Sequence, residues 1–171
     1  MIFSLEFQRA ISMKKLISLT TLTLLSIYSV PAAFAEGVPG ETSFSHLFHS
    51  NAHPNDARAL SAMHHFKLHV QGSDLSQISI DLPEGVKIRR GVEVTDQSGK
   101  KLDADVSIND KKATVAFSRP VSPETILTVS MKGVQTPFPG YRKTWRYSVS
   151  GKNQNMEEDV LFGTAQIQTY E

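Results

Sequence analysis

Histidines are the residues of this sequence whose type and spacing could do chemistry. All 6 lie between positions 46 and 69, and neutral imidazole is the commonest protein ligand of zinc and copper. The pattern predicts a Cu or Zn site that draws on His46, His49, His53, His65 and His69. The alternative is a polar segment in which histidine is only a hydrophilic surface residue. Neither an H-x-H nor an H-E-x-x-H motif is present to decide between the two.

The spacing of these histidines limits which of them can share an ion. The spacing of His46, His49 and His53 would place them on one face only if their segment were helical. On a strand, His65 and His69 point the same way but lie about 13 Å apart, which is too far for one ion. A metal site must therefore combine ligands from both segments, and the thioether of Met63 would suit Cu(I).

The elements that position the histidines are predicted to be β-strands. Short runs of alternating apolar and polar residues, separated by turn residues, are typical of a β-sandwich or barrel. His64 shares its parity with Phe66, Leu68 and Val70, so we expect it inside the fold rather than among ligands. The predicted strands cover 63–70, 75–82, 92–95, 102–108, 112–117, 126–131, 143–149 and 160–170.

Seven to eight strands in one short domain favour an immunoglobulin-like antiparallel β-sandwich, with a small barrel as the alternative. We expect three parts: a signal peptide over 1–35, an extended arm or loop over 36–62, and the sandwich over 63–171. The leader has Lys14 and Lys15, an apolar run and an Ala33-Phe34-Ala35 cleavage signature. Its apolar run is shorter than the roughly 18–20 residues that span a membrane. Translation could start at Met1 or Met13.

Export and composition narrow the class of protein. The chain has no cysteine, which excludes disulfides, thiolate metal ligands and a cysteine nucleophile. Removing the leader takes away three of the 18 basic residues and one of the 17 acidic ones. The remaining chain has a formal charge of −1, which argues against nucleic acid as a partner. The expected location is the periplasm or the cell exterior.

Four segments carry a resemblance to a known family: residues 65–70, 113–121, 126–134 and 161–167. Together they resemble the cyanobacterial family called domain of unknown function 2808, whose members are exported proteins with no established activity. The likeness covers about 63–170 and consists of strand patterns and a proline-bounded turn. It implies export and carries over no site residues. The histidine-rich stretch departs from what we associate with that family.

No nucleophile elbow, P-loop or dinucleotide-binding glycine pattern is present. We therefore expect a non-catalytic binding or accessory module with no cofactor and with an envelope protein or small ligand as its partner. The alternative is a periplasmic copper- or zinc-binding protein. Phe138, Tyr141 and Arg142 lie in and after a proline-stiffened loop and are the candidate partner-binding residues, because aromatic residues and arginine dominate binding hot spots.

Overall fold

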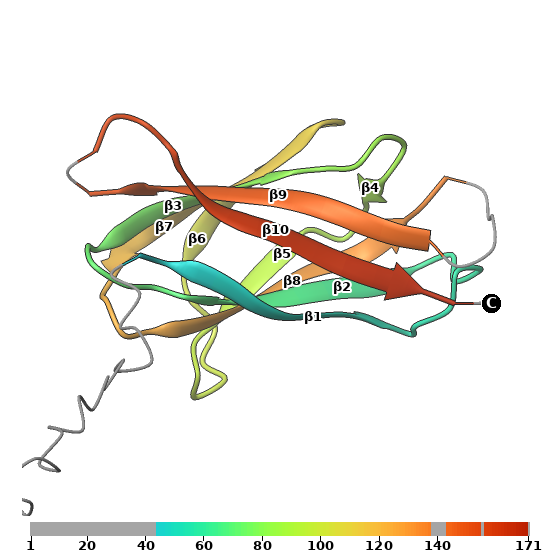
Figure 1. The fold of residues 1–171 in the computed structure, drawn as a ribbon, viewed down its shortest axis with the longest axis horizontal. Coiled ribbons are helices and arrows are strands. Elements are labelled where there is room, and N and C mark those ends of the chain that lie inside the picture. The colour runs from blue at the N-terminus through green and yellow to red at the C-terminus, as the bar shows by residue number, and fades with distance from the viewer. Residues whose placement is uncertain (1–43, 138–142, 155, 171) are drawn as a thin grey trace, which may run out of the picture. The chain divides into compact units, whose positions relative to one another are not determined.

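The chain forms two antiparallel β-sheets that pack face to face (Figure 1). The computed structural model describes residues 44–137, 143–154 and 156–170. Within these ranges the protein has ten strands and no helix. It follows that no helix of the described part is long and apolar enough to cross a membrane. The predicted immunoglobulin-like sandwich is confirmed, with ten strands instead of seven to eight. The predicted signal peptide lies outside the described residues.

The first sheet carries the histidine-rich segments. Its strands follow the order β1-β2-β8-β4, and β5 also pairs with β8. All of these pairings are antiparallel. The strands of this sheet are β1 (His46–His53), β2 (Ala62–His69), β4 (Lys87–Ile88), β5 (Val92–Thr95) and β8 (Ile126–Gln135).

The second sheet covers the inner face of the first. Its strand order is β10-β9-β3-β7-β6, again antiparallel throughout. Its strands are β3 (Leu75–Asp81), β6 (Ala104–Ile108), β7 (Lys112–Val121), β9 (Lys143–Asn153) and β10 (Val160–Thr169). The strands predicted from alternation are all present, and β7, β8 and β9 each extend four residues beyond their predicted ends.

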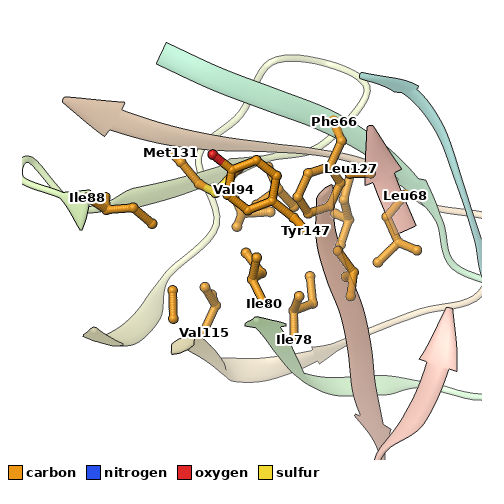
Figure 2. Packing of buried hydrophobic residues seen from close by; sticks show 14 of the residues in the cluster. Phe66, Leu68, Ile78, Ile80, Ile88, Val94, Val115, Leu127, Met131 and Tyr147 are labelled. Atoms are coloured by element: carbon orange, nitrogen blue, oxygen red, sulfur yellow. The ribbon is translucent and has the colours of Figure 1, made fainter. Parts of the chain in front are cut away.

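The core lies between the two sheets and is built by two-residue alternation. In β2 the even positions are buried and the odd positions are half-buried, as a pleated strand with one face on the core requires. Figure 2 shows the side chains of Phe66, Leu127 and Tyr147 gathered in this interior, and all three are buried. Trp145 is also buried, and its indole Nε1 donates a hydrogen bond to Thr169 Oγ1 at 3.1 Å.

Strand β1 lies inside the segment 36–62, where the sequence predicts an arm or loop. The prediction missed this strand because β1 lacks a regular alternation of buried and exposed positions. Its pairing with β2 shifts register between Phe48 and Asn51, which marks a β-bulge, and a bulge breaks the two-residue period. The first sheet therefore begins at His46 rather than at Met63.

The edge where β1 meets β10 shows why the fold is a sandwich and not a small barrel. The two strands lie side by side, and the Ser50 hydroxyl donates a hydrogen bond to the Gln166 carbonyl at 2.7 Å. They nevertheless belong to separate sheets, with no ladder between them. A side-chain hydrogen bond thus links the two edge strands, and the two sheets do not join into a continuous barrel.

Gly151 in β9 is a described position where added volume has little room. A Cβ atom built on it would lie 2.3 Å from Cε2 of Phe162 and 2.7 Å from the backbone oxygen of Gln77. We expect Gly151→Ala to lower the free energy of unfolding by about 1–3 kcal/mol, measured by urea denaturation. Arg146→Ala, at an exposed position of the same strand, should change it by about 0.5 kcal/mol or less. Equal effects of the two variants would contradict this packing.

Candidate metal site on the β1–β2 ribbon

The pairing of β1 with β2 brings the two histidine-bearing segments together. The register places His46 opposite His69 and Asn51 opposite His65. We call the outer surface of these two strands the histidine face; it carries His46, His49, His53, His65 and His69. The sequence predicts that ligands must come from both segments, and the register shows how the fold joins them.

His64 is the one histidine of β2 that points into the core. Its side chain is buried, and its Nδ1 lies 2.7 Å from the Tyr147 hydroxyl, with which it shares a hydrogen bond. Burial and, to a smaller extent, the neighbouring His65 lower the pKa of His64 to about 4. Burial also raises the pKa of Tyr147. The prediction from strand parity that His64 is an interior residue is confirmed.

His46 and His69 form the first cross-strand pair on the histidine face. Their ring centroids lie 5.4 Å apart with an angle of 73° between the ring planes. His46 Nδ1 is 3.3 Å from the Phe44 carbonyl oxygen, and His69 Nε2 is 3.4 Å from Glu124 Oε2. Sequence reasoning missed Glu124, because only the fold brings the β7–β8 turn beside the end of β2.

His49 and His65 form the second pair, with ring centroids 6.2 Å apart and an angle of 41° between the ring planes. The Nδ1 atom of His65 is buried and has no hydrogen-bond partner among the described residues. The pKa of His65 lies below its ordinary value, first because the ring is partly buried and then because of the positive charges that His49, Lys67 and His53 can carry. A neutral imidazole is the form that binds metals.

The histidine face therefore holds two separated pairs rather than one cluster. Among the described residues, no group of three or more His, Cys, Asp or Glu side chains is arranged to hold a metal ion. A metal at either pair would take two nitrogen ligands from the histidines. Any further ligand would have to be something other than the described His, Cys, Asp and Glu side chains. His53 is exposed beside the second pair and lies opposite Met63 in the ladder.

The predicted partner-binding residues Phe138, Tyr141 and Arg142 lie outside the described residues. The same region contributes Trp145 and Tyr147, which the alternation of β9 predicts to be core residues. Both side chains are buried, as two residues on the inner face of a strand are expected to be.

The fold and the two-sheet topology define the class of protein: an immunoglobulin-like antiparallel β-sandwich. The sequence profile of a family described as "Protein of unknown function (DUF2808)" matches residues 41–157. The chain belongs to this family, which is the one that its strand patterns resemble. No curated protein matches the sequence.

Several solved structures are similar in fold. The collagen-binding domain from a Staphylococcus aureus adhesin is 9% identical with a TM-score of 0.43, and the match covers 77% of this chain and 100% of that one. BslA, a bacterial hydrophobin, is 13% identical with a TM-score of 0.46, covering 75% and 94%. The major pilin subunit BcpA of Bacillus cereus is 14% identical with a TM-score of 0.45, covering 73% and 39%. These likenesses concern the fold alone.

Proposed function

We propose that the protein is an exported, non-catalytic binding module of the periplasm or cell envelope, and that its ligand is a zinc or copper ion on the histidine face. The observation that carries the proposal is the β1–β2 register, which sets His46 opposite His69 and brings the His49 ring beside His65. Export is supported by the leader pattern of residues 1–35.

Two features of the ribbon support a metal as the ligand. First, residues directly opposite in an antiparallel ladder have Cβ atoms about 4.5–5.5 Å apart, a distance from which two imidazoles can bind one ion. Second, imidazole suits zinc and copper, and the interactions of His46 with Phe44 and of His69 with Glu124 hold these rings in place, as partners of ligating histidines commonly do.

Calorimetric titration with Zn(II) and with Cu(II) tests the proposal on the exported protein, purified after expression of the full chain. We expect a dissociation constant of about 10 μM or tighter for at least one of the two ions. Replacing one histidine from each pair, His65→Ala with His69→Ala, should weaken that binding by about tenfold or more. Lys67→Ala is the matched control, because Lys67 lies between these two histidines on the same strand and supplies no imidazole.

Affinity weaker than about 10 μM for both ions, or affinity that the double replacement leaves unchanged, would refute the metal as ligand. The binding module would then have an envelope protein or a small molecule as its partner. A pull-down from envelope extracts, with the exported protein as bait, tests that outcome. Recovery of nothing above background would count against the binding module itself.

A further inference from the structure

The bulge in β1 is what turns His49 toward the histidine face. Between the paired positions Phe48–Lys67 and Asn51–His65, strand β1 has two residues where β2 has only Phe66. In a regular strand His49 would share the inner face with Leu47. Because a bulge bends the strand and re-aims a side chain, the His49 ring instead lies beside His65.

The backbone of His49 is unusual in a second way. Its φ angle is 50°, in the left-handed region, which is uncommon for residues other than glycine although histidine adopts it more often than most. The next residue, Ser50, is fixed to β10 through its hydrogen bond to the Gln166 carbonyl. Unfavourable backbone conformations of this kind are found where the surrounding structure imposes them, and they gather at binding sites. The bulge and the Ser50 hydrogen bond thus fix the backbone that carries the exposed His49 side chain.

The spacing of the two histidine pairs distinguishes two coordination geometries. With metal–nitrogen bonds of about 2 Å and ring nitrogens about 1.1 Å from their centroids, two imidazoles in line with an ion have centroids about 6.2 Å apart. At a tetrahedral angle the same bonds give about 5 Å. The 6.2 Å of His49 and His65 equals the separation of an in-line pair whose ring nitrogens both face the ion, and the 5.4 Å of His46 and His69 is nearer to that of a tetrahedral pair.

Cu(I) is the ion whose chemistry fits an in-line pair. It accepts two nitrogen ligands in line, whereas structural Zn(II), which has a filled d shell as well, is bound by four ligands in a tetrahedron. Among the described residues, no third His, Cys, Asp or Glu side chain joins this pair in a metal-binding arrangement. The half-buried thioether of Met63 lies on the same ribbon, two residues from His65, and soft sulfur ligands favour Cu(I). The buried, unpartnered Nδ1 of His65 is a nitrogen that such an ion would satisfy.

We propose that His49 and His65 form a Cu(I) site, with the two imidazole nitrogens in line through the ion. This inference rests on the proposed function and specifies its ion, its ligands and its geometry. Its structural basis is the β1 bulge together with the 6.2 Å separation of the two rings. The pair His46 and His69, on the same ribbon, serves as the internal comparison.

The test is a competition for Cu(I) between the exported protein and a chromophoric chelator, bicinchoninate, without oxygen and with ascorbate present. The variant is His49→Asn, because asparagine tolerates a left-handed backbone and the bulge is therefore kept. We expect His49→Asn and His65→Ala each to weaken Cu(I) binding by about tenfold or more. Lys67→Ala, on the same face of β2 but with no imidazole, should change it by less than about twofold. Thermal melts of each variant confirm that it is folded.

X-ray absorption of the Cu(I)-loaded protein supplies the geometric readout. We expect two nitrogen neighbours in line and at most one sulfur. Equal Cu(I) affinity of the wild-type protein and His49→Asn, or four light-atom neighbours around the ion, would overturn the inference. Binding of Zn(II) through His46 and His69 without binding of Cu(I) would also overturn it while leaving the proposed function intact. Binding of neither ion would overturn both.

Discussion

Acidification to pH 4 is expected to lower the free energy of unfolding by about 3 kcal/mol through His64 alone. Burial against Tyr147 and the core lowers the pKa of His64 from 6.5 to about 4 in the folded protein. The unfolded chain therefore binds a proton near pH 6.5 that the folded chain accepts only near pH 4. The contribution of His64 to stability is fully present above pH 6.5 and is lost as the pH falls toward 4.

The measurement is a series of urea denaturations between pH 7.5 and pH 4, on the wild-type protein and on His64→Gln. Glutamine does not titrate and keeps an amide that can hydrogen-bond the Tyr147 hydroxyl. The wild-type protein should lose about 3 kcal/mol more unfolding free energy than His64→Gln over this range, because titrating groups that are not coupled to His64 act equally in both. Parallel curves for the two proteins would show that His64 is not the buried neutral group described here.

Truncation of Phe66 is expected to cost about 3–5 kcal/mol of unfolding free energy, the usual range for a buried phenylalanine. Its ring is fully buried between the two sheets, close to Leu127 and Tyr147 (Figure 2). Phe66→Ala removes this buried surface and leaves a cavity that a packed core fills only in part.

Phe48→Ala is the matched control for this truncation. Phe48 lies in the neighbouring strand β1, and its side chain is 38% exposed. Because it is only partly removed from water, its truncation should cost about 1 kcal/mol or less. The two variants, compared by thermal and urea unfolding, should thus differ by at least about 2 kcal/mol. A cost for Phe66→Ala similar to that of Phe48→Ala would contradict the assignment of Phe66 to the core.

Two-residue alternation in the sequence predicts the parts of the fold where one face of a strand is buried and the other is not. It places His64 and Phe66 inside, and it assigns Trp145 and Tyr147 to the core. It fails for β1, where the bulge at His49 interrupts the period and only one of the eight positions is buried. It also fails for β4, which has only two residues, Lys87 and Ile88. A strand this short leaves no pattern to detect.

The sequence predicts which residues form the candidate site but not how they pair, for a related reason. The composition identifies the histidines, and strand geometry shows that His65 and His69 cannot share one ion. Which histidine of β1 lies beside each histidine of β2 depends on the register of the two strands. That register is set by long-range strand pairing and cannot be read from local spacing. The approach of Glu124 to His69 is a tertiary contact of the same kind. The division of the histidines into two pairs therefore became apparent only from the folded structure.

The most direct test of a metal site on the histidine face is a set of long-range ¹H–¹⁵N spectra of the six histidine rings, recorded with and without Cu(I). Cu(I) has no unpaired electrons, so the ring signals remain observable on binding. Our account predicts large shifts for the ring nitrogens of His49 and His65, and a signal of His64 that stays in place because its ring faces the core. Spectra in which no ring responds to the ion, or in which all six respond alike, would contradict it.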